Sequence, residues 1–113
     1  MHEMAIADAL LRMILELTKD CTDRPISARI SCGQLNAVNP DALCFAFDVL
    51  AKGTRCEGMR LDIQIIPFQA SCKGCGHVYD IEQQYRCPRC GRDQFVLMPE
   101  QPLVLESVDF EGD

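Results

Sequence analysis

Apolar and polar residues recur with a helical period along the N-terminal segment. From Glu3 to about Lys19, polar residues return every three or four positions and apolar residues fill the opposite side. Asp8 precedes Arg12 by four residues, a spacing that favours an ion pair on one helix face. A helix with so wide an apolar face is expected to pack against a sheet. The residues predicted to form that face are Ile6, Leu10, Leu11, Met13, Ile14, Leu15 and Leu17.

A strand, a helix and a second strand are predicted next. Residues 26–31 and 61–65 alternate between apolar and polar, the period of half-buried strands. Between them, Asn39 is a helix N-cap residue, Pro40 suits the first helical position, and the helix is expected to end before Gly53, its predicted C-cap. Strands joined through a helix favour parallel pairing with a right-handed crossover. The core positions of this helix are Leu43, Phe47 and Leu50.

Two Cys-x-x-Cys pairs, Cys72/Cys75 and Cys87/Cys90, are separated by eleven residues, and a glycine follows each pair. Paired turns of this kind supply four thiolates to one tetrahedral zinc ion. The alternatives, redox-active pairs of the thioredoxin kind or scattered thiols, fit two such closely spaced pairs less well. A zinc ion held by four thiolates has no open position for a water, so the predicted zinc is structural and a hydrolytic zinc enzyme is disfavoured.

A further buried strand begins at Leu103 and extends toward Phe110. Too little chain remains for another domain, so this strand is expected to return to the first sheet. The predicted fold class is therefore α+β: a small three-stranded mixed sheet with two helices, plus an inserted four-cysteine zinc ribbon. The predicted domains are residues 1–69 with 99–113, a nickel-binding α/β domain on the argument below, and residues 70–98, the zinc ribbon.

Composition narrows the function classes. The 113 residues carry a formal net charge of −6, and four zinc-bound thiolates bring it to about −8. Nucleic-acid binding is therefore disfavoured, because it requires a cationic surface. No secretion signal or membrane-spanning run is recognised, which with eight cysteines predicts a reducing cytoplasm and no membrane insertion. The cysteines outside the pairs, expected as small buried hydrophobes, are Cys21, Cys32, Cys44 and Cys56.

The C-terminal segment is acidic. From Pro99 onward there are five acidic residues and no basic ones. We expect them to form a solvated sheet edge and tail.

The extreme N-terminus is a candidate metal site. A free terminal amine can bind a metal near neutral pH, and the His2 ring Nδ1 closes a six-membered chelate with its own backbone nitrogen. A neighbouring backbone nitrogen, from Met1 or Glu3, adds a five-membered ring. Three nitrogens in one plane suit Ni²⁺ or Cu²⁺. The fourth ligand is left open among the Glu3 carboxylate, a partner protein and His77, and an ordinary surface histidine is the competing interpretation.

His77 follows the second zinc cysteine by two residues. It could replace a cysteine on zinc, stack on the ribbon as a structural residue, or act as a modulator that senses a second metal site. Four cysteines already satisfy the zinc ion, so the structural role is favoured.

The chain resembles one family, the HypA/HybF hydrogenase maturation factors, nearly from end to end. The resemblance is carried by Met1–Met4, by residues 33–38 (GQLNAV), by residues 43–47 (LCFAF) and by the two cysteine pairs. It implies a cytoplasmic nickel metallochaperone that delivers Ni²⁺ to the large-subunit precursor of a nickel-iron hydrogenase. Its implied partners are a HypB-type GTPase and, in some organisms, urease maturation proteins; the chain itself is expected to be a monomer or a weak homodimer.

By position, the resemblance implies that His2 is the essential nickel ligand, with Glu3 and the nitrogens of Met1 completing or supporting the site. The implied zinc ligands are the four paired cysteines. Nothing in the sequence resembles a nucleophile, an acid–base pair or a phosphate loop, so no enzyme activity is predicted. The competing hypothesis is a zinc-ribbon adaptor, without nickel transfer, whose acidic surface docks a basic protein.

Overall fold

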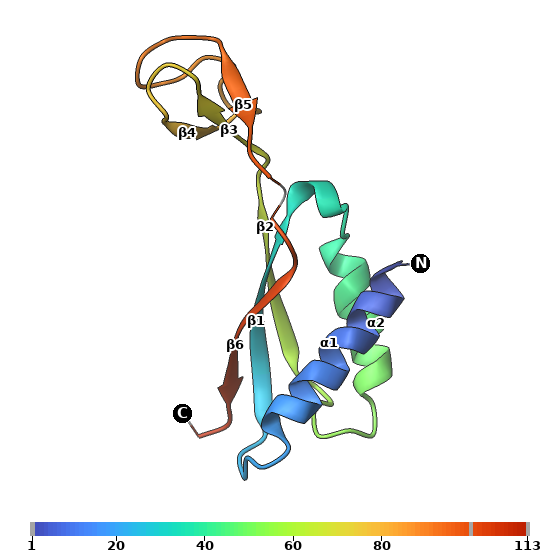
Figure 1. The fold of residues 1–113 in the computed structure, drawn as a ribbon. Coiled ribbons are helices and arrows are strands. Elements are labelled where there is room, and N and C mark those ends of the chain that lie inside the picture. The colour runs from blue at the N-terminus through green and yellow to red at the C-terminus, as the bar shows by residue number, and fades with distance from the viewer. Residues whose placement is uncertain (1, 100, 113) are drawn as a thin grey trace.

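The structure is a computed structural model that describes residues 2–99 and 101–112 (Figure 1). The prediction that Met1 takes part in a metal site falls outside these residues. The elements in chain order are α1 (His2–Thr18), β1 (Pro25–Gly33), the 3-10 turn η1 (Gln34–Asn36), α2 (Pro40–Ala51), β2 (Arg60–Ile66), β3 (Gln69–Cys72), β4 (Val78–Asp80), β5 (Phe95–Leu97) and β6 (Val104–Phe110).

The larger sheet has the strand order β2-β1-β6. β1 pairs in parallel with β2, where Ile30 faces Ile63, and antiparallel with β6, where Ile30 faces Leu105. The C-terminal strand therefore returns to the first sheet beside β1. The predicted mixed three-stranded sheet and the parallel pairing of its first two strands are both confirmed.

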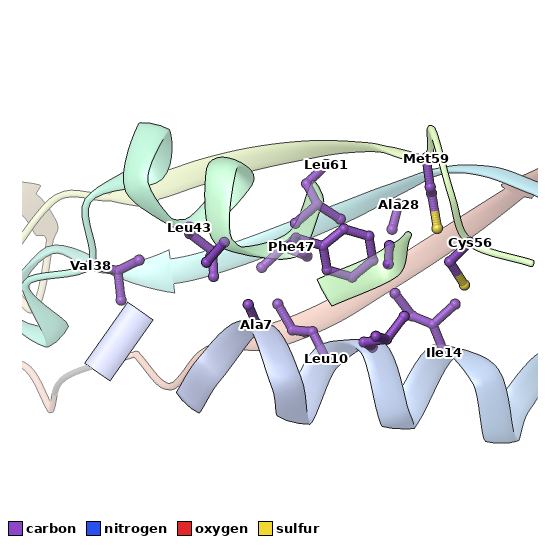
Figure 2. Packing of buried hydrophobic residues seen from close by; sticks show 14 of the residues in the cluster. Ala7, Leu10, Ile14, Ala28, Val38, Leu43, Phe47, Cys56, Met59 and Leu61 are labelled. Atoms are coloured by element: carbon purple, nitrogen blue, oxygen red, sulfur yellow. The ribbon is translucent and has the colours of Figure 1, made fainter. Parts of the chain in front are cut away.

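Both helices lie on the same face of this sheet (Figure 1). Figure 2 shows Phe47 of α2 in the middle of the core, with Leu10 and Ile14 of α1 on one side and the strands on the other. These three side chains are fully buried, as is Ile30 at the centre of the sheet. The core is thus built from two helices and one sheet face, as the apolar patterns predict.

The buried face of α1 differs from the predicted one at its second half. Met13 and Leu17 are 46% and 63% exposed. Thr18 is buried instead, because its hydroxyl donates a hydrogen bond of 2.7 Å to the Ile14 carbonyl and so needs no water. The helix carries more apolar residues than one side can bury. Its packing against α2 as well as the sheet selects Ala7, Leu10, Leu11, Ile14 and Thr18.

α2 begins and ends as its sequence predicts. The Asn39 side chain accepts a hydrogen bond of 3.1 Å from the N–H of Ala42, and Pro40 occupies the first turn. The helix ends before Gly53, which adopts a φ of +82°, a conformation that favours glycine. The C-cap residue is Lys52 and not the predicted Gly53, which follows it and takes the left-handed conformation.

The other face of the sheet is polar. Ser27 and Ser31 of β1 are buried there, and each donates a hydrogen bond to an acidic residue of β6. The distances are 3.0 Å from Ser27 Oγ to Asp109 Oδ2 and 2.7 Å from Ser31 Oγ to Glu106 Oε1. Part of the acidic C-terminal segment therefore fastens the last strand to the sheet while both acidic residues stay exposed to solvent.

The four cysteines outside the Cys-x-x-Cys pairs are not all buried. Cys32 and Cys56 are buried as expected, but Cys21 is exposed and Cys44 lies between these extremes. Cys21 lies in the connection between α1 and β1, outside the packed core.

The second sheet has the order β4-β3-β5 and projects beyond the end of the first (Figure 1). Two connections join the sheets, and η1 contacts both of them. Gln34 accepts a hydrogen bond from the N–H of Phe68 and donates one of 3.0 Å to Glu82. The Asn36 amide donates to the Gln101 carbonyl at 2.7 Å. The predicted division into two domains stays a prediction.

No helix in the two described ranges is long and apolar enough to cross a membrane.

Candidate metal centre

Each Cys-x-x-Cys pair forms a tight turn closed by the glycine that follows it. The N–H of Gly76 donates to the Cys72 carbonyl at 2.9 Å, and the N–H of Gly91 donates to the Cys87 carbonyl at 2.8 Å. The two glycines have φ values of +78° and +81°. A side chain would be strained in this left-handed region, so the glycines allow the chain to fold back around a metal ion.

Backbone N–H groups inside the turns point at sulfur. Gly74 N lies 3.3 Å from Cys72 Sγ, and Arg89 N lies 3.4 Å from Cys87 Sγ. Such hydrogen bonds stabilise the thiolate form that a metal requires. The two turns therefore repeat the same arrangement around one centre.

The four sulfurs converge. Cys72 Sγ lies 3.4 Å from Cys90 Sγ, and Cys75 Sγ lies 3.5 Å from Cys87 Sγ. All four ligand atoms are within 4.8 Å of one another. A tetrahedral ion with Zn–S bonds of about 2.3 Å would separate its sulfurs by about 3.8 Å. The quartet therefore fits zinc, and its spacing is too long for disulfide bonds.

The thiols of the zinc-free quartet differ in acidity. The pKa of Cys72 is lowered to about 6, first because the N–H of Cys75 donates a hydrogen bond to it. The N–H of Arg92 lowers the pKa of Cys90, but the shared hydrogen with Cys72 and the burial of the thiol outweigh this and raise it to about 11. Cys72 and Cys90 thus share a hydrogen, which a metal ion would displace.

A cationic side chain covers the first turn. A Cβ atom at Gly74 would overlap the side chain of Arg92, including its guanidinium group. The absence of a side chain at Gly74 therefore lets the guanidinium lie against the first Cys-x-x-Cys turn, where a positive charge suits a four-thiolate zinc complex of net negative charge. The signal in the sequence was the small residue inside the first pair, but nothing there indicates which cation would use the space.

Tyr79 and His77 lie beside the quartet. Tyr79 is 6% exposed and packs with Cys72 and Cys87. Burial first, and then the charges of Cys72 and Cys87, raise the pKa of its hydroxyl, which has no hydrogen-bond partner among the described residues. The His77 ring stacks on the Tyr79 ring, with centroids 6.4 Å apart and an interplanar angle of 11°.

The predicted nickel residues lie at the start of α1. The His2 side chain is 52% exposed, and its Nε2 lies 3.6 Å from Glu3 Oε2. The same Glu3 oxygen accepts a hydrogen bond of 3.2 Å from the backbone N–H of Asn39, at the start of α2. This bond is the first cause of a lowered Glu3 pKa, so the carboxylate is ionised at neutral pH. The contact with Asn39 was not predictable, because the two residues are far apart in sequence.

The two metal regions are separate. Within residues 2–99 and 101–112, three or more potential metal-ligating side chains converge only at the cysteine quartet. His77 lies in the ribbon, between β3 and β4. His2 begins α1, which lies with α2 on one face of the larger sheet (Figure 1). The structure therefore does not bring His77 to His2.

The fold and this site define a class: small α+β metal-binding proteins with an inserted four-cysteine zinc ribbon. A family model described as "Hydrogenase/urease nickel incorporation, metallochaperone, hypA" matches residues 1–110. The chain belongs to this HypA family of metallochaperones, as its resemblance at the sequence level predicts.

Individual relatives agree with this assignment. Hydrogenase maturation factor HypA of Roseiflexus sp. (strain RS-1) is 35% identical over 116 residues, covering 100% of this chain and 94% of the relative. That of Syntrophus aciditrophicus (strain SB) is 36% identical over 99 residues, covering 86% of this chain and 87% of the relative.

Solved structures share the fold. The nickel metallochaperone HypA from Helicobacter pylori superposes with a TM-score of 0.60 at 19% identity, covering 96% of each chain. A second solution structure of a HypA protein gives a TM-score of 0.69 at 20% identity, covering 100% of this chain and 98% of that one.

Proposed function

We propose that this protein binds Ni²⁺ at its N-terminus and delivers it to the large subunit of a nickel-iron hydrogenase during maturation. The observation that carries the proposal is the position of His2 as the first residue of α1. The first N–H groups of a helix have no acceptor within the helix. The backbone nitrogen of His2 is therefore free to bind a metal without the loss of a helical hydrogen bond.

The ligands come from adjacent atoms of the chain. The terminal amine of Met1, the backbone nitrogen of His2 and the His2 Nδ1 form the two fused chelate rings expected for planar nickel. The backbone nitrogen of Glu3 is the alternative to the Met1 amine. The His2 side chain is half exposed, so few contacts oppose transfer of the metal to a tighter site.

Zinc has a different task in the proposal. Cys72, Cys75, Cys87 and Cys90 would hold it, and when bound it supplies a structural cross-link with no open coordination position. The ion therefore stabilises the ribbon and activates no water. The protein acts as a carrier, and no reaction is assigned to it.

The partners follow from the cargo. We assign a HypB-type GTPase as the source of GTP-dependent chemistry and the hydrogenase large-subunit precursor as the acceptor. Urease maturation proteins are further candidates, since the family description includes urease nickel incorporation. We place the carrier in the cytoplasm, as a monomer or a weak homodimer. It is not expected to bind nucleic acid.

A nickel titration of zinc-loaded, untagged protein, followed by visible absorption, tests the proposal. We expect about one equivalent of Ni²⁺ with a planar-nickel band, and loss of both in His2→Ala and in a protein with one extra residue before Met1. Zinc content and melting temperature should be unchanged in both controls. Equal binding by all three proteins would contradict the N-terminal site.

One observation favours a second function, the adaptor. Phe45 and Val49 of α2 are 70% and 44% exposed, one helical turn apart, and the exposed Asp41 and Asp48 lie on the same helix. Such a surface suits a partner with basic and apolar residues. The adaptor function would survive His2→Ala, whereas nickel delivery would not. Hydrogenase maturation measured in cells that carry His2→Ala separates the two.

A further inference from the structure

Glu3 joins the start of α1 to the start of α2 through one oxygen. Its Oε2 accepts the backbone N–H of Asn39 at 3.2 Å and lies 3.6 Å from His2 Nε2. The Glu3 side chain is 13% exposed, whereas the His2 side chain is 52% exposed. The carboxylate is thus held inward between the two helices while the imidazole remains accessible.

The contact with α2 is a favourable place for a negative charge. The Asn39 side chain caps α2 by accepting a hydrogen bond from the N–H of Ala42. The backbone N–H of Asn39 is a separate donor, and it needs an acceptor of its own. The Glu3 carboxylate provides it through a charge-assisted hydrogen bond. It also lies at the N-terminal ends of both helices, where the helix dipoles favour an anion. Binding of Glu3 to a metal through this oxygen would require the loss of these interactions.

The contact with His2 distinguishes its two ring nitrogens. The chelate with the backbone uses Nδ1, which must then carry a lone pair, while Nε2 carries the hydrogen. A metal-bound histidine commonly donates this second N–H to a carboxylate, which sets the ring orientation and increases its basicity. The Glu3 oxygen lies on the Nε2 side of the ring, and a small rotation of His2 would shorten 3.6 Å to a hydrogen bond.

We propose that the Glu3 side chain positions the nickel site and that its carboxylate is not a nickel ligand: the carboxylate is anchored to α2 by the Asn39 N–H and orients the His2 ring through Nε2. This inference rests on the proposed N-terminal nickel site. It removes Glu3 from the three candidates for the fourth ligand. Because the structure keeps His77 in the ribbon, that position is assigned to a group from outside the described chain, either a partner protein or a solvent molecule.

The test compares Glu3→Ala, Glu3→Gln and Glu16→Gln in zinc-loaded protein. Glu16 is the matched control, because it is an exposed glutamate on the same helix whose carboxylate pairs with Lys19. Two quantities are measured: the wavelength of the planar-nickel band, which reports the ligands, and the nickel affinity in competition with a chelator. We expect all variants to keep the wild-type wavelength. Glu3→Ala should lose about 10- to 100-fold in affinity, the usual effect of a residue that supports a metal ligand.

Glu3→Gln should recover part of the affinity, because its amide oxygen can accept one of the two hydrogen bonds without the charge. Glu16→Gln should match wild type. Planar Ni²⁺ is diamagnetic, so the His2 Nε2–H proton can be followed by NMR. We expect it to be protected from solvent exchange in nickel-loaded wild type and unprotected in Glu3→Ala. A variant that merely destabilised the fold would lower the melting temperature without this selective change.

The outcomes separate the two proposals. A shifted nickel band in Glu3→Ala would make Glu3 a ligand and overturn its positioning role, while the N-terminal site would stand. Unchanged affinity and unchanged Nε2–H protection would also overturn the positioning role. If wild type binds nickel no better than the protein with an extended N-terminus, the proposed site itself fails.

Discussion

The two sheets of this protein are stabilised in different ways. The larger sheet carries two helices and a continuous core centred on the fully buried Phe47. The smaller sheet has strands of three or four residues, and its buried cluster consists of Ala70, Cys72, Tyr79 and Cys87. Two of those four residues belong to the cysteine quartet. Apolar burial can therefore hold the first unit, whereas the second is expected to depend on a metal bound there.

The same contrast applies to the two metals. The cysteine quartet offers four ligands to one ion, with backbone N–H groups hydrogen-bonded to the sulfurs of Cys72 and Cys87 and with Arg92 covering one turn. At the proposed nickel site, the one ligand side chain that the structure describes is that of His2, and it is half exposed to solvent. A metal that supports a fold needs a complete ligand set, while a cargo metal needs a site that it can leave.

Removal of zinc is expected to have the largest effect, because it should destabilise the smaller sheet and spare the larger one. Chelation or Cys87→Ser should unfold residues 70–98 and leave the helices and the larger sheet in place. Apparent binding energies of structural zinc are about 10–16 kcal/mol, more than so small a unit can replace. Amide hydrogen exchange of the zinc-free protein measures this directly. The control is Cys21→Ser, at an exposed cysteine outside the quartet, which should change nothing. Native-like protection of the ribbon without zinc would contradict the prediction.

The second test disrupts the apolar core of the larger sheet. Phe47→Ala should lower the free energy of unfolding of the larger unit by about 3–5 kcal/mol, because it leaves a cavity between the helices and the sheet. Urea denaturation followed by circular dichroism measures the loss. The visible spectrum of Co²⁺ substituted into the ribbon should stay the same.

Phe45 is the matched control for that experiment. It lies on the same helix and is 70% exposed, so Phe45→Ala should change the free energy of unfolding by less than about 0.5 kcal/mol. Equal losses from the two substitutions would mean that the core is not where the structure places it.

The third and smallest effect is the pH dependence of zinc binding. Zinc must displace the protons of its thiols, so its affinity falls as the pH falls. The lowered pKa of Cys72, about 6, depends on the backbone hydrogen bonds of the formed turn. In a zinc-free ribbon that has unfolded, the thiols instead carry their protons up to the ordinary pKa of about 8.5. The affinity should therefore fall with a single slope from pH 8 to pH 5, by about one factor of ten per pH unit for each thiol that releases its proton.

Competition with a zinc chelator between pH 5 and pH 8 measures that slope, and a pH indicator measures the protons released. The same titration of His2→Ala protein is the control, because it reports zinc binding without the N-terminal site. A change of slope near pH 6 would contradict this, because it would show that the Cys72 turn and its lowered pKa persist without zinc.

Much of the fold was predictable because the signals are local. The cap of α2 involves Asn39 and Ala42, which are three residues apart, and each zinc turn is closed within five residues of chain. Strand alternation at residues 26–31 and 61–65 depends only on which positions face the core. The convergence of the four cysteines was predictable for the same reason, since spacing within a turn determines where two thiols point.

The face of α1 was predicted less well. The periodicity predicts burial of Met13 and Leu17 as strongly as it predicts burial of Leu10 and Ile14. The structure instead buries Thr18 in place of Leu17. The choice depends on how α1 lies against α2 and the sheet, which no pattern within the helix contains. The surplus apolar residues remain in solvent.

The sequence by itself determined the cysteine quartet, the two helices, the strands of the larger sheet, the pairing of β1 with β2 and the family, because each depends on short-range spacing or on likeness along the whole chain. The tertiary structure alone decided that Glu3 meets Asn39, that Gln34 meets Glu82 and that Arg92 covers Gly74. The first two contacts join residues more than thirty positions apart, and all three depend on how completed turns, helices and sheets come to lie against one another. Side chains that act across such junctions leave no periodic trace in the sequence.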